Sequence, residues 1–210
     1  MRAHAVSMKP LSTVPPVPNL TRTLRCSAAA VVLASWLAAP CLSQEQLNIE
    51  VVRVGDYITV TASAELQANP RIAWEVLSDY DDLARFIPDI RSSRVLRRDA
   101  DGPVVEQKGE FGFLFFRQAI EVIMAVREEP PRRIVARAIS GNMKDMEGRY
   151  ELLPSLKGVR LAYYGRFVPD FFVPPLIGMP IVRRSLERRF RAMAEEIERR
   201  DALARDKAGR

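Results

Sequence analysis

The sequence predicts an α+β fold: a curved, seven-stranded antiparallel sheet wrapped around a long C-terminal helix, with two short helices after the first hairpin. Most of residues 47–168 alternates between apolar and polar side chains, which is the period of strands with one buried face and one wet face. Residues 181–200 instead repeat apolar side chains every three or four positions, as an amphipathic helix does. A sheet with this many strands can curl, so we expect it to bury the apolar stripe of the helix.

Residues 1–43 have the features of a secretory signal peptide, and we predict one domain at residues 44–205 and a disordered tail at residues 206–210. Two arginines precede an apolar run at residues 26–39, and small residues follow it, which is the order of an export signal. The run is shorter than the roughly 20 residues that span a bilayer. We therefore expect an exported protein, periplasmic or secreted. The alternative is a membrane anchor formed by an uncleaved N-terminal segment.

The charge and the residue types of the predicted mature chain exclude several kinds of function. The leader holds four basic residues and no acidic one, so removing it lowers the formal net charge from +6 to +2. A charge that small does not favour a nucleic-acid partner. The single histidine, His4, and both cysteines, Cys26 and Cys41, also lie in the leader. The mature chain therefore lacks the groups for a Ser-His-Asp triad, a cysteine nucleophile or a disulfide, and we assign it no catalytic residue, metal or cofactor.

The first predicted elements are a hairpin and two short helices. Strand-like runs at residues 47–54 and 57–66 flank a short turn that contains glycine, which is a hairpin signal. Asn69 and Pro70 then supply an N-cap and a first-turn proline for a helix. A second short helix is predicted over residues 83–86.

The later strands and the last helix complete the predicted fold. Runs with strand-like alternation follow at residues 94–98, 104–110, 113–127, 133–139, 144–153 and 159–168. Pro180 fits the first turn of the long helix, where its missing N–H costs nothing. The opposite face of this helix is dense in arginine, and its apolar stripe consists of Val182, Leu186, Phe190, Met193 and Ile197.

Several sequence blocks carry a resemblance to a known family. They read Ala-Trp-Glu-Val-Leu-Ser-Asp-Tyr-Asp at residues 73–81, Phe-Ile-Pro-Asp-Ile at 86–90, and Ser-Gly-Asn-Met-Lys at 140–144 ahead of a Gly-Arg-Tyr at 148–150, with a Pro-Pro at 174–175 before the helix. With this order of elements, residues 50–200 resemble the START-like (SRPBCC) helix-grip superfamily, in particular its polyketide cyclase/dehydrase and coenzyme Q-binding START-type branch. The resemblance implies a deep apolar cavity between sheet and helix that binds a hydrophobic small molecule or lipid. A few members of the family catalyse cyclisation or dehydration there.

Strand parity predicts which side chains face this cavity. A filled core is the alternative to a cavity. Among the candidates, Gln118, Tyr150 and Tyr163 are polar, and they either fix a ligand carbonyl or hydroxyl or bond within the protein, because a buried polar group needs a partner. The predicted ligand-binding residues are Leu114, Phe116, Gln118, Ile120, Met124, Ala136, Met146, Tyr150, Leu161, Tyr163 and Phe167 from strands, and Leu186 and Phe190 from the helix.

Two further clusters have alternative interpretations. Asp79, Asp81 and Asp82 could hold a hard cation, but helix capping and turn formation explain them more simply. The connection at residues 171–179 is unusually apolar, and it either closes the cavity as a lid, contacts a membrane surface, or packs against its own sheet edge. The residues predicted for lid or membrane contact are Phe171, Phe172, Leu176 and Ile177.

These observations favour an exported, monomeric protein that binds and carries a hydrophobic small molecule or lipid, such as a quinone or an isoprenoid. One alternative is a cyclase or dehydratase that uses Tyr150, Tyr163 or an aspartate as general acid or base. A chemical weakness of that alternative is that no pair of acid–base groups clearly points inward. Another alternative is a partner-binding module that uses the apolar loop at residues 171–179.

Overall fold

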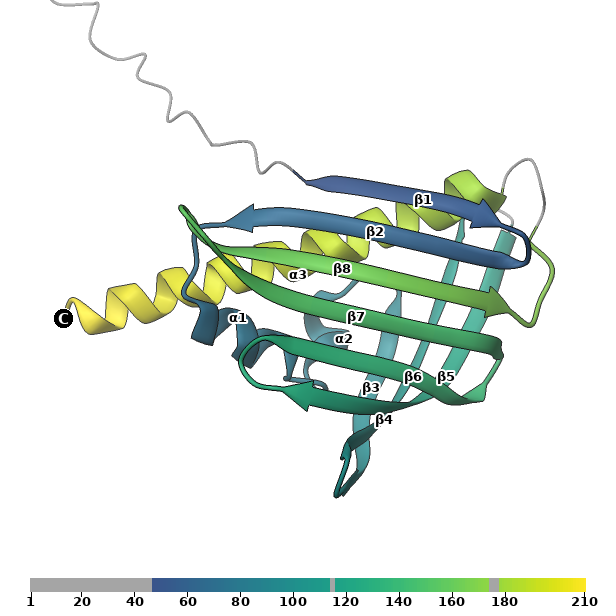
Figure 1. The fold of residues 1–210 in the computed structure, drawn as a ribbon, viewed down its shortest axis with the longest axis horizontal. Helices are drawn as coiled ribbons and strands as arrows, with labels where there is room; N and C mark the ends of the chain where they lie inside the picture. Colours follow the sequence, from purple (N-terminus) through teal and green to yellow (C-terminus); the bar gives the residue numbers. More distant parts are fainter. Residues whose placement is uncertain (1–46, 114–115, 174–177) are drawn as a thin grey trace, which may run out of the picture. The chain divides into compact units, whose positions relative to one another are not determined.

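The computed structural model describes residues 47–113, 116–173 and 178–210, so the predicted leader lies outside the described residues. These residues form an antiparallel sheet and three helices (Figure 1). The helices are α1 (Pro70–Leu77), α2 (Leu83–Phe86) and α3 (Gly178–Ala208). The strands are β1 (Asn48–Val54), β2 (Tyr57–Leu66), β3 (Ile90–Asp99), β4 (Gly102–Phe113), β5 (Phe116–Glu129), β6 (Arg133–Gly141), β7 (Met143–Ser155) and β8 (Gly158–Pro169).

The sheet in the described part of the chain has eight strands, which corrects the predicted count of seven. The sequence contains eight strand-like runs, two in the first hairpin and six after the short helices, and each becomes a separate strand, so the predicted count was one too low. The strand order is β1-β2-β8-β7-β6-β5-β4-β3. The first hairpin therefore joins the last strand, and α1 and α2 carry the chain from β2 to the far edge at β3.

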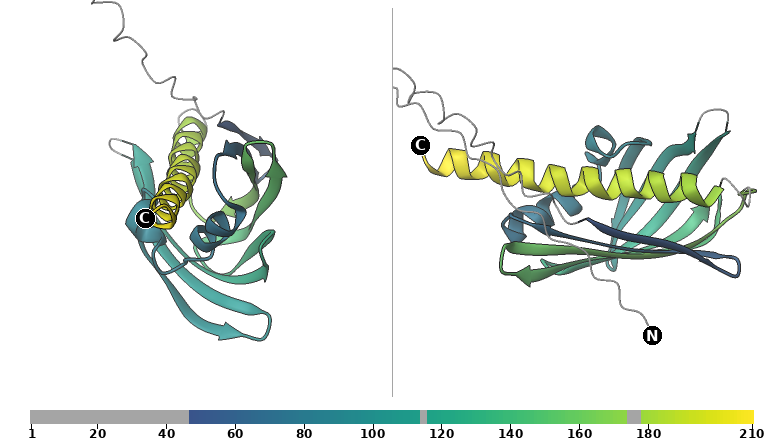
Figure 2. Two further views of the ribbon diagram at one scale, coloured as in Figure 1. Left: turned by 90° about the vertical axis from the view of Figure 1, so that its left-hand side faces the viewer. Right: turned by 90° about the horizontal axis from the view of Figure 1, so that it is seen from above.

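The sheet curls around α3, as the sequence predicts for an α+β helix-grip fold. The two views of Figure 2 place the helix inside the curve, with β3, β4 and β5 on one side and β1, β2, β7 and β8 on the other. The C-terminal end of the helix extends past the strands. None of the described helices is both long and apolar enough to cross a membrane.

The start of α1 confirms the predicted cap. The side chain of Asn69 accepts a hydrogen bond from the backbone N–H of Arg71 at 2.8 Å, and Pro70 occupies the first turn. The backbone N–H of Asn69 donates to Asp201 Oδ1 of α3, also at 2.8 Å. The cap therefore serves two purposes, since it begins α1 and fixes its end against the long helix.

Helix α3 is longer than the sequence pattern indicates. It continues to Ala208, so residues 206–208, predicted as part of a disordered tail, are helical. The segment contains no proline or glycine before Gly209, and Arg205 Nε forms an ion pair with Asp201 Oδ2 at 2.9 Å one turn earlier. Such i,i+4 pairs stabilise the end of a helix.

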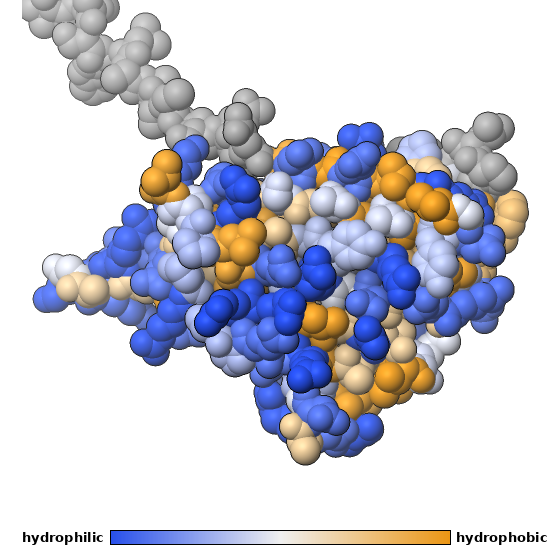
Figure 3. Space-filling view, in the orientation of Figure 1, coloured by the Kyte–Doolittle hydropathy of each residue, from blue (hydrophilic) through white to orange (hydrophobic). Residues whose placement is uncertain are grey.

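The core is divided along the helix. The larger cluster lies beneath α1 and the second half of α3, and its fully buried members include Leu66, Val76, Leu161 and Ile197. A smaller cluster near the start of α3 contains Ile58, Val173 and Val182. The outer face of the sheet that Figure 3 shows is mostly hydrophilic, with apolar side chains interspersed, as alternation along the strands requires.

Candidate functional site

Two adjoining cavities lie between the concave face of the sheet and α3. The inner cavity has a volume of about 180 Å³ and the outer one about 130 Å³. Each is well above the roughly 10–15 Å³ that one water molecule needs by the same kind of measure. The described residues that line both are Ile90, Gln107, Tyr163, Met146, Leu186 and Arg189.

The inner cavity is apolar over most of its wall. Aliphatic and methionine side chains come from the strands, from α2 and from α3. The polar groups in its wall are Tyr80, Gln107, Tyr150, Tyr163 and Arg189. A largely apolar pocket with a few polar groups is the common form of a small-molecule site.

Two glycines make room for Tyr163 on the floor of the cavity. Gly148 of β7 and Gly165 of β8 are register partners, so the sheet has no side chain at that point. The Tyr163 ring lies over this gap: a Cβ atom at Gly165 would come within 2.7 Å of Tyr163 Cζ, and one at Gly148 within 3.1 Å of Tyr163 Oη. The Tyr150 ring packs on that of Tyr163, with the ring centroids 4.6 Å apart. The pair therefore depends on both glycines.

Arg189 of α3 places a guanidinium at the junction of the two cavities. Its Nη2 donates to the backbone carbonyl of Glu110 at 3.3 Å. Its Nε is buried and has no hydrogen-bond partner among the described residues. Burial lowers the pKa of Arg189, and the nearby carboxylate of Asp89 opposes this shift. Burial raises the pKa of Tyr163 to about 12 and also raises that of Tyr150, while the positive charge of Arg189 acts in the opposite direction on both hydroxyls.

Asp89 holds α3 against the edge formed by β3 and β4. Its carboxylate accepts hydrogen bonds from Ser185 Oγ at 3.0 Å and from Arg188 Nη2 at 2.6 Å. Its backbone has φ of 68°, a left-handed conformation that aspartate tolerates better than most residues. The backbone N–H of Glu110 donates to the Asp89 carbonyl at 2.9 Å. These contacts fix the turn of α3 from which Arg189 reaches the cavities.

Comparison with known proteins identifies the family. The model of the family described as polyketide cyclase / dehydrase and lipid transport matches residues 57–200, more than half of the chain. The chain belongs to this family. A comparison with curated protein sequences gave no match.

Solved structures of START-like proteins share the fold. A START superfamily protein from Mycobacterium smegmatis is 20% identical with a TM-score of 0.54, over 70% of this chain and 98% of that chain. The Zhui aromatase/cyclase from Streptomyces sp. R1128 is 17% identical with a TM-score of 0.54, over 74% and 94%. A STAR-related lipid transfer protein from Xanthomonas axonopodis is 14% identical with a TM-score of 0.56, over 73% and 98%. At these identities the likeness is one of fold.

The structure of this polyketide cyclase/dehydrase and lipid transport family member brings most of the predicted site residues to the cavities. Those that line a cavity are Ile120, Met124, Ala136, Met146, Tyr150, Tyr163, Phe167, Leu186 and Phe190. That they contact a ligand stays a prediction. Leu161 instead lies in the larger core cluster and is fully buried. Gln118 is not among the described lining residues, and its Nε2 donates to the Ala119 carbonyl at 3.1 Å. Leu114 and the side chain of Phe116 lie outside the described residues.

Sequence reasoning missed Arg189, although the sequence contains a signal for it. Arg189 follows Leu186 by three positions and precedes Met193 by four, so it lies on the same helix face as the apolar stripe. The signal is easily overlooked because this helix contains many other arginines. The position of Arg189 inside the apolar stripe distinguishes it from the solvent-exposed arginines.

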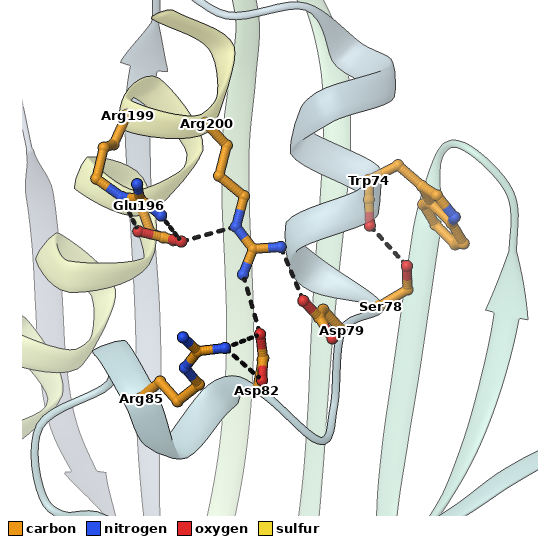
Figure 4. A network of polar contacts seen from close by, with 8 residues as sticks. All are labelled: Trp74, Ser78, Asp79, Asp82, Arg85, Glu196, Arg199 and Arg200. Carbon is orange, nitrogen blue, oxygen red and sulfur yellow. Dashed lines mark hydrogen bonds and ion pairs between the residues drawn. The ribbon is translucent and has the colours of Figure 1, made fainter. Parts of the chain in front are cut away.

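The aspartate cluster is structural (Figure 4). Arg200 of α3 lies between three carboxylates: its Nε contacts Glu196 Oε1 at 2.7 Å, its Nη1 contacts Asp79 Oδ2 at 2.8 Å, and its Nη2 lies 4.0 Å from Asp82 Oδ2. The side chain of Asp81 accepts a backbone N–H of β3 at 2.8 Å. The carboxylates therefore join α1 and α2 to the end of α3. The turn predicted for them forms, because the backbone N–H of Asp82 donates to the Asp79 carbonyl at 3.1 Å, but the side chain of Asp82 makes no capping hydrogen bond to α2.

The described part of the apolar loop divides between the cavity and the surface. Phe171 and Val173 line the outer cavity, while the side chain of Phe172 is 72% exposed. Alternate residues of an extended segment point in opposite directions, which explains the division. Leu176 and Ile177 lie outside the described residues.

Proposed function

We propose that this family member is an exported carrier of a hydrophobic small molecule, such as a quinone or an isoprenoid. The observation that supports this most strongly is the inner cavity, whose wall is apolar apart from a few polar groups. The family description, which includes lipid transport, agrees with it. The protein acts as a monomer in this proposal, and the described strands and helices of one chain line the inner cavity.

A carrier fits the chemistry of the cavity better than a cyclase or dehydratase does. A catalytic acid or base works best when its pKa lies near the operating pH. Burial raises the pKa of Tyr163 to about 12 and that of Tyr150 as well, so both remain neutral hydroxyls near neutral pH. The described residues that line the inner cavity include no carboxylate. The tyrosines are therefore suited to hold a ligand oxygen by a hydrogen bond.

Export is the second part of the proposal, and residues 1–43 support it. Their charged, apolar and small-residue segments occur in the order of a secretory signal. Cleavage after this segment removes every histidine and cysteine of the chain. The intact mass of protein recovered from the exported fraction tests this, and a mass that retains the leader would contradict it.

Filling the inner cavity tests the carrier function. Ala136→Phe adds an aromatic ring to the wall, and we expect it to weaken binding of the neutral apolar dye N-phenyl-1-naphthylamine by about tenfold or more, because overpacking costs about 1–3 kcal/mol. Ala125→Phe is the matched control, since Ala125 is exposed on the neighbouring strand. Dye fluorescence measures binding, and farnesol or a short-chain quinone serves as competitor. Equal binding by both variants would exclude the cavity as the site.

We also propose that the apolar loop contacts a membrane surface when ligand is exchanged. Phe172→Ser is expected to weaken the affinity for phosphatidylcholine vesicles in co-sedimentation by about tenfold or more, because an inserted phenylalanine contributes about 1.5–3 kcal/mol. Leu156→Ser is the control, since Leu156 is also exposed but lies in the β7–β8 turn. A vesicle affinity that Phe172→Ser leaves unchanged would contradict membrane contact.

A further inference from the structure

We propose that the ligand is a monocarboxylate with an apolar chain, and that Arg189 binds its carboxylate. The chain of the ligand occupies the inner cavity, and the carboxylate lies at the junction of the two cavities, beside the hydroxyls of Tyr150 and Tyr163. This inference rests on the proposed carrier function and narrows its ligand to an acid, which excludes a neutral quinone and keeps an isoprenoid only in the form of its acid. It follows from the charges that line the cavities.

Arg189 differs from the other charged residues of the cavity walls. In the outer cavity, Asp89 pairs with Arg188 at 2.6 Å, Lys108 with Glu121 at 3.6 Å, and Glu147 with Arg137 at 3.1 Å. Within the described part of the chain Arg189 forms no ion pair, and Asp89, the acid whose charge acts on it, already accepts hydrogen bonds from Ser185 and Arg188. The wall therefore contains a guanidinium whose charge no described side chain neutralises by contact.

An unpaired cation in an apolar wall is costly for the protein alone. A guanidinium has five N–H donors, and the described residues accept one of them, through the Glu110 carbonyl. The buried Nε–H loses its hydration without a replacement. A bound anion would remove this cost, because it supplies both the missing acceptor and the opposite charge. Residues kept at a cost in stability commonly have a functional reason.

The shape and charge of the site favour a carboxylate over other anions. A guanidinium matches the two oxygens of a carboxylate with two parallel hydrogen bonds. Arg189 is the single charged group among the described residues of the inner cavity, so it balances one negative charge. A phosphate monoester carries about −1.5 to −2 at pH 7 and would leave excess negative charge in an apolar wall. The hydroxyls of Tyr150 and Tyr163, on which the charge of Arg189 acts, line the same cavity and provide further donors.

Matched ligands with one chain length test the inference. We expect the wild-type protein to bind dodecanoate at least tenfold more tightly than 1-dodecanol in isothermal titration calorimetry, and more tightly than dodecyl phosphate. Arg189→Met should remove the preference for dodecanoate over 1-dodecanol. Arg191→Met is the control, because Arg191 is exposed and pairs with Glu187 one turn away. Arg189→Met should also melt at the wild-type temperature or higher, since it removes a buried Nε–H without an acceptor and a charge without an ion-pair partner.

The possible outcomes separate this inference from the carrier proposal. Equal affinity of the wild type for dodecanoate and 1-dodecanol would overturn the carboxylate site and leave the carrier proposal standing. Tighter binding of dodecyl phosphate would replace the carboxylate with a phosphate. Failure to bind any of the three ligands would count against the carrier itself. A melting temperature of Arg189→Met well below that of the wild type would show that the guanidinium stabilises the fold, and would also overturn the inference.

Discussion

Replacing Leu161 with Ala is expected to lower the free energy of unfolding by about 2–5 kcal/mol. Leu161 is fully buried in the larger core cluster, opposite Ala64 of β2 and Leu152 of β7. The substitution removes its packing contacts and leaves a void that the rigid sheet cannot close. Urea denaturation followed by circular dichroism measures the change.

Met146→Ala provides the comparison for this prediction. Met146 lines both cavities, so part of its side chain already faces empty space. We expect the free energy of unfolding to fall by about 1–2 kcal/mol, mainly because less apolar surface is buried on folding. We also expect the ligand affinity to change. Equal losses of stability in the two variants would show that the cavities are filled in solution.

Replacing Gly165 with Val is expected to weaken binding of the neutral dye by about tenfold or more. The new side chain would occupy the space of the Tyr163 ring, because a Cβ atom alone would lie 2.7 Å from Tyr163 Cζ. The ring must then move into the cavity, and overpacking of this kind costs about 1–3 kcal/mol. Dye fluorescence and a crystal structure of the variant measure the two effects.

Ala162→Val is the control for Gly165→Val. Ala162 lies on the same strand but on the other face of the sheet, where valine suits a strand. It should leave dye binding unchanged. If Gly165→Val binds the dye as the wild type does, the floor formed by the two glycines has no role in shaping the cavity.

Strand parity explains how much of the site the sequence reveals. Antiparallel strands alternate sides at every residue, so the sequence predicts that Met124, Ala136 and Tyr163 face inward, and they line the inner cavity. Parity does not say how far along a strand the cavity reaches. For this reason two of the predicted residues lie away from the cavities. Gln118, at the start of β5, bonds to the backbone, and Leu161 is covered by packed core.

Features that depend on long-range packing could not be predicted from local patterns. The pairing of β2 with β8 joins segments about a hundred residues apart, and no short motif marks it. Arg200 meets Asp79 at 2.8 Å for the same reason: the contact needs α3 to lie across α1 and α2. Arg189 could be placed on the apolar face of its helix, but its missing partner becomes visible only when the surrounding residues are in position.

Native mass spectrometry of the protein purified from the exported fraction, followed by organic extraction, shows directly whether the protein carries a ligand. We expect a mature chain without residues 1–43 that carries one bound apolar molecule, released and identified by the extraction. A chain that carries no ligand, and that takes up none from a panel of lipids, quinones and fatty acids, would contradict the carrier function.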